Sequence, residues 1–424
     1  MKKFLLKGIF NDKGRSLLPI IVVATGTMVT VLLYSWITGI MGESIEMSSN
    51  MNTGDLKVMT RLYAEDYEQL PNDLAILNAD ALIAELKEME PSVEWVKRIR
   101  FGALADFPDS LGETRGQGPV AGWAIDMLTT GTKEPHRFNL EGSVIQGSLP
   151  KSPGQCLLSE DLAKKFSIGP GDSFTLFGTT MEGGFSFRNF TVSGTVRFGA
   201  AGLDRGAVII DISDAQSAFG MESAAGEILG YLPDTWYDDD VALSIKDKFN
   251  QKYSGDTDGF APVMMTLKEQ SGMADMVEYT NYISGLMVFI FVAAMSIVLW
   301  NGGLLGGLRR YTEFGVRLAL GEDKGHIYKT LLYEALMIGT IGSILGTIIG
   351  VLIVLYLNVH GVNLSGMMKN STLLLPSIFR PAITSTIYYI GFIPGIFSMI
   401  LGNGIAGLGI YKRETARLFN ELEV

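Results

Sequence analysis

A dense group of charged residues separates two of the most apolar stretches of the chain, in the run LRRYTEFGVRLALGEDKGHIYKTLLYEAL from Leu308 to Leu336. Its members carry both signs of charge, and they are Arg309, Arg310, Glu313, Arg317, Glu322, Asp323, Lys324 and Lys329. Charged side chains on a short segment can pair with opposite charges on a soluble partner protein. The same pattern is typical of the basic residues that border short cytoplasmic loops of membrane proteins, so the spacing alone leaves both interpretations open.

The other residues that could do chemistry do not form a catalytic or metal-binding pattern. His136, His326 and His360 lie far apart in the sequence, and Cys156 is the only cysteine, so no disulfide can form within the chain. The acidic run at 238–240 lacks the D-x-[DN]-x-[DN]-G spacing of a calcium loop. GEDKGHIYKT lacks the G-K-[ST] of a Walker A loop, and neither G-x-S-x-G nor H-E-x-x-H occurs. We therefore expect no catalysis by this chain and no cofactor or metal bound by it.

The elements around the charged group are expected to be membrane spans. Of the 424 residues 47% are hydrophobic and only 19% are charged, and the mean hydropathy is +0.25, which indicates a chain that is part membrane and part soluble. A span needs about 20 apolar residues as helix. The sequence predicts four transmembrane helices, at 16–42, 279–308, 331–359 and 381–411.

The orientation of these spans follows from the N-terminus. The leader MKKFLLKGIFNDKGR is basic, the apolar run after it is too long for a signal peptide, and SWITGIMGES offers no A-x-A-like cleavage site. We therefore expect an uncleaved anchor with residues 1–15 in the cytoplasm. The expected external segments are 43–276 and 360–380, and the expected cytoplasmic segments are 309–330 and 412–424. The long segment from 42 to 276 carries 36 acidic and 19 basic residues, whereas the basic excess lies in the cytoplasmic parts, as the positive-inside rule requires.

The large external segment is predicted to be an α+β domain inserted between the first and second spans. Leu82, Leu86 and Met89 give one apolar stripe of a helix that ends before Pro91. Farther along, Ser159 is expected to cap a helix, and GPGD marks a turn before the alternating run SFTLF. The run TWYDDDVALSIKDKFNQKYSGDTDGF predicts a further strand and helix, with the three aspartates in a solvated turn.

The predicted spans carry small residues at four-residue intervals, and the one charged residue within them is Glu334, near the start of the third span. The intervals are Gly302 with Gly306, Gly303 with Gly307, Gly342 with Gly346 and Gly350, and Gly391 with Gly395. Such faces allow close helix packing, although glycine is common in membrane helices and the spacing can be incidental. Ion-coupled transporters usually need an ionisable residue near the midplane. We therefore expect the energy for any transport to enter from outside the membrane.

The charged run between the second and third spans resembles the signature of the FtsX-like permease family of ABC transporters. The family pattern R-x-x-E-[IF]-G-[VI]-R-x-A-x-G is matched by Arg310, Glu313, Phe314, Gly315, Val316, Arg317, Ala319 and Gly321, with Glu334 at the start of the next span. LLSEDLAKKFSIGPGDSFTLFG and FTVSGTVRFGAAGLDRGAVIIDISDAQ look like the periplasmic core of the LolC/LolE and MacB branches. The C-terminal run YKRETARLFNELEV departs from the family because it lacks the usual proline.

The resemblance implies a permease subunit without catalytic activity, driven by a separate cytoplasmic ATPase that binds ATP and magnesium. Its coupling helix at 309–330 would dock on that ATPase, with Phe314, Val316 and Leu318 as an apolar anchor. The coupling residues are Arg309, Arg310, Glu313, Phe314, Gly315, Val316, Arg317, Ala319 and Gly321. The resemblance further implies a bacterial inner-membrane location, a second permease chain (identical or different), contact with membrane lipid, no nucleic acid, and a lipoprotein or a periplasmic carrier as partner.

Three functions fit this family resemblance. The preferred one is release of lipoproteins from the inner membrane by mechanotransmission, and the alternatives are MacB-like efflux of periplasmic peptides or drugs and FtsX-like signalling to a cell-wall hydrolase. The apolar run LSGMMKNSTLLLPSIF in the second external loop can either contact lipid or pack under the large domain.

Overall fold

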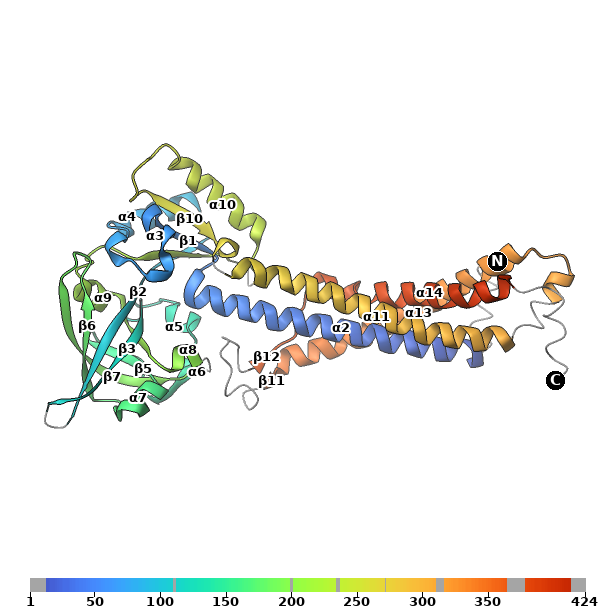
Figure 1. Ribbon diagram of the computed structural model, residues 1–424, viewed down its shortest axis with the longest axis horizontal. Helices are drawn as coiled ribbons and strands as arrows, with labels where there is room; N and C mark the ends of the chain where they lie inside the picture. The colour runs from blue at the N-terminus through green and yellow to red at the C-terminus, as the bar shows by residue number, and fades with distance from the viewer. Residues whose placement is uncertain are drawn as a thin grey trace. The chain divides into compact units, whose positions relative to one another are not determined.

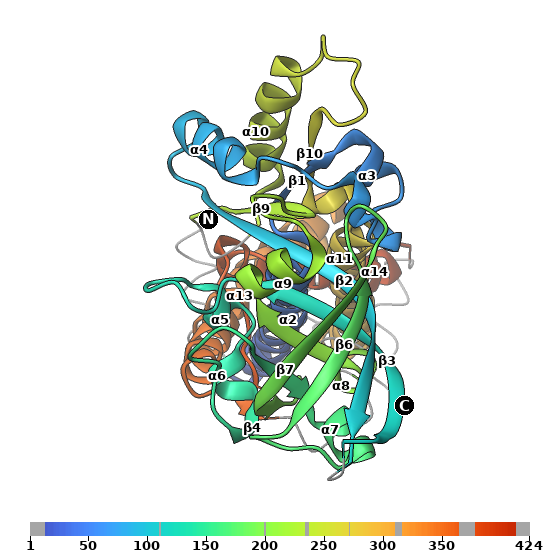
Figure 2. The same cartoon turned by 90° about the vertical axis from the view of Figure 1, so that its left-hand side faces the viewer.

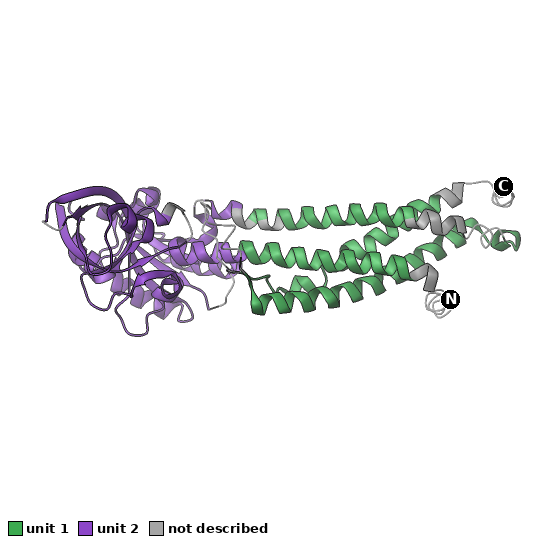
Figure 3. Ribbon diagram, turned by 90° about the horizontal axis from the view of Figure 1, so that it is seen from below, with its two compact units in different colours: residues 1–41, 278–363, 378–424 green, residues 42–277, 364–377 purple. Residues whose placement is uncertain are grey.

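The chain forms two compact units in a computed structural model, which describes residues 13–109, 112–198, 201–233, 237–270, 272–309, 316–363 and 378–412 (Figure 3). Unit 1 contains residues 1–41, 278–363 and 378–424. Unit 2 contains residues 42–277, which we call the inserted domain, together with 364–377. The run LSGMMKNSTLLLPSIF begins in 364–377 and so falls mostly outside the described residues.

Unit 1 is built from four long apolar helices, whose arrangement can be followed in Figure 1. They are α2 (Lys13–Ser48), α11 (Met273–Arg309), α13 (Lys324–His360) and α14 (Phe392–Lys412). Each contains a stretch long and apolar enough to cross a membrane. A helix of 36 or 37 residues extends for roughly 54 Å, whereas the hydrocarbon core of a bilayer is about 30 Å thick. Three of the helices are therefore longer than a span requires.

The fourth apolar helix begins later than its expected start at residue 381. The strands β11 (Val362–Asn363) and β12 (Ile378–Phe379) pair, and a short 3₁₀ turn η5 (Ser385–Tyr388) precedes α14. Between them, Ala382 exchanges hydrogen bonds with Ser35, and the Asn358 amide donates to the carbonyl oxygen of Pro381 at 2.9 Å. These bonds to α2 and α13 hold the chain around Pro381 in a non-helical conformation.

Glycines bring the backbones of α2, α13 and α14 into contact. A Cβ on Gly346 would lie 2.3 Å from the carbonyl oxygen of Ala24, and one on Gly342 would lie 2.7 Å from Val23. A Cβ on Gly395 would lie 2.1 Å from the Ser343 hydroxyl oxygen. The glycine spacing in α13 and α14 is therefore a packing surface and not incidental. Gly302, Gly303, Gly306 and Gly307 lie in α11, but their surroundings fall outside the described residues.

The inserted domain is built on one sheet of ten strands (Figure 2). The strands are β1 (Leu56–Thr60), β2 (Glu94–Pro108), β3 (Thr114–Ile125), β4 (Val144–Gly147), β5 (Gln155–Ser159), β6 (Ser173–Thr179), β7 (Phe185–Val196), β8 (Ala207–Asp211), β9 (Glu227–Tyr231) and β10 (Pro262–Thr266). Six of them close a ring in which β2 pairs with β3, then β8, β5, β7 and β6 follow, and β6 pairs with β2 again. Only β3 with β8 and β5 with β7 are parallel.

The long strand β2 belongs to both parts of this sheet. Its first residues, Glu94–Arg98, pair with β9, and from Ile99 onward it pairs with β3 inside the ring. Beyond β9 lie β1 and then β10, which pair antiparallel from Leu56 with Thr266 to Thr60 with Pro262. The first and last strands of the inserted domain are therefore neighbours at one end of the sheet.

The helices of the inserted domain cover these strands. They are α3 (Arg61–Glu65), α4 (Ala79–Met89), α5 (Glu134–Arg137), α6 (Leu140–Ser143), α7 (Glu160–Phe166), α8 (Ala201–Asp204), α9 (Ile212–Phe219) and α10 (Asp239–Lys252), with short turns η1 (Ser49–Thr53, π-helical), η2 (Tyr67–Gln69), η3 (Asn72–Leu74) and η4 (Leu267–Glu269). One core packs α9 and α7 with the ring, for example Phe101 against Phe219, and a second packs α4 and α10 on β1, β9 and β10. The prediction of an α+β inserted domain is confirmed.

Two local predictions in this domain need correction. Ser159 occupies the N-cap position of α7, as predicted, but its buried side chain makes no capping hydrogen bond. The three aspartates do not form a solvated turn, because α10 already begins at Asp239. The Asp238 carboxylate accepts hydrogen bonds from the backbone N–H groups of Asp240 and Val241 and so caps this helix. Helix formation here is favoured because the carboxylate satisfies N–H groups that lack helical partners.

Candidate functional site

The candidate site is the segment that joins α11 to α13, which we call the joining segment (residues 309–323). Arg309 is the last residue of α11, and nothing is described of its side chain. Four predicted coupling residues, Arg310, Glu313, Phe314 and Gly315, fall outside the described residues. Val316, Arg317, Ala319 and Gly321 are described, and the geometry of the site rests on them.

Residues 316–319 are helical and lead into a glycine, and we call residues 316–320 the turn. The N–H of Leu320 donates to the carbonyl oxygen of Val316 at 3.0 Å, and the N–H of Glu322 donates to that of Arg317 at 3.1 Å. Gly321 has φ +88°, in the left-handed region that side chains with a Cβ rarely adopt. The glycine of the family motif is therefore required here by the backbone, because it ends the turn and reverses the chain.

Arg317 and Glu322 form a bidentate ion pair across this glycine. Nε and Nη2 of Arg317 donate to the two carboxylate oxygens of Glu322, each at 2.6 Å. Both side chains are 26% exposed. The hydrogen bonds from Arg317, together with its positive charge, lower the pKa of the Glu322 carboxyl from its ordinary value. His326 Nε2 lies 3.7 Å from the same carboxylate.

The helix α13 begins directly after this pair, inside the range 309–330 that was expected to be one coupling helix. Asp323 caps it, since its carboxylate accepts the backbone N–H of Gly325 at 2.9 Å. The described part of the joining segment is therefore a turn, a reversal at Gly321 and a capped helix start. Asp323 at the N-terminus of α13 is also favoured by the helix dipole.

Two exposed apolar side chains lie on the turn. Val316 is 55% exposed and Leu320 is 82% exposed. They are four residues apart, which is the spacing of neighbours on one helix face. Leu320 was not among the predicted coupling residues, although its four-residue interval from Val316 was a signal in the sequence that could have found it.

A second polar constellation, absent from the sequence predictions, lies inside the inserted domain. Arg98 Nε and Nη2 donate to the Glu134 carboxylate at 2.7 and 3.0 Å, with Arg98 1% exposed and Glu134 fully buried. Lys57 Nζ and Glu227 Oε1 are 3.2 Å apart, and both are buried. Burial lowers the pKa of the Lys57 ammonium, although the charge of Glu227 opposes that effect.

The same constellation reaches the end of helix α2. The Tyr231 hydroxyl donates to the carbonyl oxygens of Ser49 and Asn50, at 3.4 and 3.3 Å, in the π-helical turn η1. The guanidinium of Arg137 lies 4.0 Å from the centre of the Tyr231 ring and forms a 2.8 Å ion pair with Glu94. Carbonyl groups at the end of a helix often lack partners within it. The Ser49 carbonyl oxygen accepts the backbone N–H of Gly54 at 2.8 Å, so the buried tyrosine adds a second donor there.

Metal and thiol chemistry find no support in the described part of the chain. Among those residues no group of three or more His, Cys, Asp or Glu side chains could hold a metal ion. Cys156 is a free thiol in the ring core, where burial raises its pKa and disfavours the reactive thiolate.

Two family models match the chain. The MacB-like periplasmic core domain matches residues 16–248, which is more than half of the chain, and the FtsX-like permease C-terminal domain matches residues 285–415. The transmembrane protein LolC of the lipoprotein-releasing system, from Xylella fastidiosa strains 9a5c and Temecula1, is 23% identical over 208 residues. These residues are 47% of this chain and 48% of LolC, so the chain spans about half the length of the curated relatives it matches.

The solved structures give a more distant likeness. The periplasmic region of MacB from Actinobacillus actinomycetemcomitans is 14% identical, with a TM-score of 0.34, over 55% of this chain and 95% of that one. The family assignment therefore rests on the two family models. Because the MacB-like model covers more than half of the chain and the FtsX-like model covers its last three apolar helices, this chain belongs to the MacB-like family of ABC transporter permeases, with an FtsX-like permease domain over residues 285–415.

Proposed function

We propose that this chain is the membrane-spanning subunit of an ABC transporter that turns ATP hydrolysis into motion of its inserted domain. The observation that carries the proposal is the pair of family matches, a MacB-like core over 16–248 followed by an FtsX-like permease domain over 285–415. The four apolar helices support it, since no charged residue lies in the central part of any of them. Ion-coupled transport through the bundle would usually need an ionisable residue near its middle, so we assign the work to the inserted domain.

The proposed orientation places residues 1–15, the joining segment and residues 412–424 in the cytoplasm of a bacterium, and the inserted domain on the periplasmic side of the inner membrane. The basic leader and the acidic inserted sequence support this orientation. The joining segment can then reach a cytoplasmic ATPase. That ATPase binds ATP and magnesium, whereas this chain binds no cofactor, and two permease chains pair over two ATPase subunits.

The proposed substrate is a lipoprotein that is released from the outer leaflet of the inner membrane to a periplasmic carrier. The likeness to LolC, whose name describes a lipoprotein-releasing system, supports this choice. The test is depletion of the chain in its own host, followed by fractionation of radiolabelled lipoproteins. Lipoproteins are expected to accumulate in the inner membrane, and restored chain is expected to clear them. Normal release in depleted cells would contradict the proposal.

MacB-like efflux of periplasmic peptides or drugs is the second candidate, because the MacB-like core model covers the larger part of the chain. Efflux predicts that depleted cells release lipoproteins normally but become sensitive to exported peptides or drugs. Failed septal wall hydrolysis with neither defect would instead indicate signalling of the FtsX type. The same depleted strain therefore distinguishes the three functions.

A further inference from the structure

Two residues of the joining segment, Arg317 and Glu322, are connected by both backbone and side-chain hydrogen bonds. Arg317 and Glu322 are connected through the backbone, by the 3.1 Å hydrogen bond from the Glu322 N–H to the Arg317 carbonyl oxygen. They are connected again through the side chains, by the two 2.6 Å hydrogen bonds of the bidentate pair. A bidentate guanidinium–carboxylate pair fixes geometry as well as distance, because two parallel bonds define one plane.

This double connection links the turn to the helix that follows it. Glu322 is followed at once by Asp323, the capping residue of α13. Gly321, with φ +88°, provides the reversal but cannot hold it, since glycine has the largest conformational freedom of any residue. The direction in which Val316 and Leu320 point relative to the start of α13 therefore depends on the ion pair that bridges the glycine.

From this geometry we propose that Arg317 is a positioning residue. It acts on the cytoplasmic ATPase through Glu322, by holding the turn 316–320 in a fixed direction on the end of α13, and not by pairing with a carboxylate of the ATPase. The inference rests on the function proposed above. It changes the role expected from the sequence, in which Arg317 was assigned to direct contact with the partner.

The geometry favours positioning over direct contact because the guanidinium already donates along one edge to a carboxylate. A partner carboxylate on that edge would have to displace Glu322 from two short, charge-assisted hydrogen bonds. The apolar side chains of Val316 and Leu320 are, by contrast, 55% and 82% exposed. Buried apolar contacts usually supply more of the affinity at protein interfaces than exposed charges do.

A double-mutant cycle tests the inference in the full chain, reconstituted in nanodiscs with the ABC ATPase that co-purifies with the tagged wild type. The variants are Arg317→Gln, Glu322→Gln and the double variant, and the readout is the ATP turnover that the chain stimulates. Each single variant is expected to lower stimulation by about twofold to fivefold, the range typical of a partly exposed ion pair. The double variant is expected to be no worse than either single variant, because both remove the same connection.

A second readout uses the chain alone and needs no ATPase. Amide hydrogen exchange at Leu320, Gly321 and Glu322 is expected to accelerate in each single variant. The charge exchange Arg317→Glu with Glu322→Arg is expected to restore the slow exchange and the stimulation together. Lys248→Gln, which breaks an exposed pair with Glu90 in the inserted domain, is the matched control and should change neither readout.

The outcomes separate this inference from the proposed function. If the double variant stimulates ATP turnover clearly less than Glu322→Gln does, Arg317 acts by more than its pair with Glu322 and the inference is overturned. Unchanged exchange at residues 320–322 in Arg317→Gln also overturns it. If no ATPase is bound or stimulated by the wild-type chain, the proposed function fails whatever the exchange data show.

Discussion

At the scale of single residues, the molecule places its charges in two different environments. Arg317 and Glu322 are partly exposed, so water screens their attraction and the pair governs the shape of a turn more than overall stability. Arg98 and Glu134 are buried, so each depends on the other to offset the loss of hydration. The consequences of removing one partner should therefore differ between the two pairs.

Replacement of Glu134 by Gln should destabilise the inserted domain strongly. The change leaves Arg98 buried without its full counter-charge, which costs about 3 to 5 kcal/mol for pairs of this kind. Urea unfolding of the full chain, followed by tryptophan fluorescence, measures the effect. Glu90→Gln, which breaks the exposed pair with Lys248, is the control and should cost less than about 1 kcal/mol. Equal midpoints for the two variants would contradict the prediction.

The pH dependence of the turn follows from the lowered pKa of Glu322. A carboxyl whose pKa is lower when folded stabilises the fold above its unfolded pKa and loses that contribution as the pH falls through its folded pKa. The turn should therefore be intact at neutral pH and weaken only in acid. In Arg317→Gln the titration should move up toward the ordinary value of about 4.3. The carboxyl-carbon chemical shift of Glu322 measures both pKa values, and equal values would count against the pairing.

The sequence could reveal the composition of the joining segment but not this pairing. The family motif identified Arg317 and Gly321, and Glu322 was visible as one charge among several. Which carboxylate meets the guanidinium depends on the φ of Gly321, because a reversal at that residue brings together side chains that a continuous helix would separate. The motif could therefore predict that Arg317 contacts a partner protein, but it could not predict that Arg317 pairs with Glu322 within the turn.

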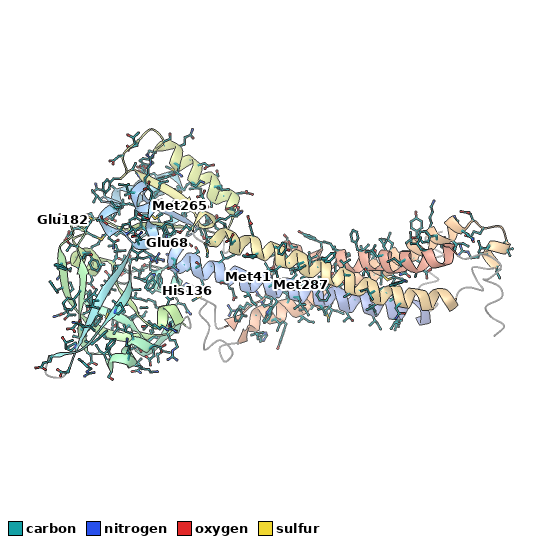
Figure 4. All side chains as sticks on the ribbon, viewed as in Figure 1. Met41, Glu68, His136, Glu182, Met265 and Met287 are labelled. Carbon is teal, nitrogen blue, oxygen red and sulfur yellow. The ribbon has the colours of Figure 1, made fainter. Side chains whose placement is uncertain are left out.

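At the scale of elements, unit 1 is held together by backbone contact between helices, whereas many side chains on its helices point outward (Figure 4). Many of those that are exposed in the middle of α13 are apolar, among them Ile348, Leu352 and Tyr356. Between helices in a membrane, apolar residues give no net hydrophobic drive, so close packing at small residues supplies much of the attraction. The glycines of α13 should therefore be sensitive to very small additions.

A pair of glycine-to-alanine changes tests this packing. Gly346→Ala should destabilise unit 1, because the added Cβ would lie 2.3 Å from the Ala24 carbonyl oxygen, a backbone atom that cannot move aside easily. Gly285→Ala in α11 is the matched control, since no atom lies within 4 Å of its added Cβ. The control should be neutral or stabilising by up to about 1 kcal/mol through helix propensity. Thermal unfolding in nanodiscs measures both, and a stabilised Gly346→Ala would refute the packing argument.

The elements differ in how far the sequence predicts them. The long apolar helices and α4 are local patterns, so the length of the apolar runs and the helical periodicity were sufficient to find them. The ring of the inserted domain is not local: Leu104 of β2 pairs with Phe177 of β6, and β6 pairs in turn with β7. No spacing in the sequence encodes which strands meet at such distances. The late start of α14 was also hidden, because it depends on bonds from Ser35 and Asn358 to the chain near Pro381.

At the scale of the whole molecule, the proposed function requires the inserted domain and the joining segment to lie on opposite sides of the membrane. Phe185 in the inserted domain is 83% exposed and Leu320 in the joining segment is 82% exposed, so each can report on one side. Cys156 is fully buried and can stay in place as an unreactive background.

Single added cysteines test this arrangement. In spheroplasts, Phe185→Cys should react with a membrane-impermeant maleimide, and Leu320→Cys should react only after the membrane is permeabilised. The positive-inside charge distribution is the physical reason for this expectation. Gel-shift after labelling gives the measurement. Labelling of Leu320→Cys in sealed spheroplasts would reverse the proposed orientation and remove the joining segment from reach of any cytoplasmic ATPase.

The pairing of β1 with β10 brings the first and last strands of the inserted domain together, which makes this domain suitable for exchange between proteins. Because Leu56 and Thr266 are neighbours on adjacent strands, the chain enters and leaves the sheet of the inserted domain at points only about 5 Å apart. A domain whose two ends lie close together can be inserted between two helices at little entropic cost, since the helix ends that it connects need not move apart. The inserted domain is therefore a portable module. Exchanging residues 55–267 between members of the family should transfer cargo preference while the helices and the joining segment keep their own ATPase.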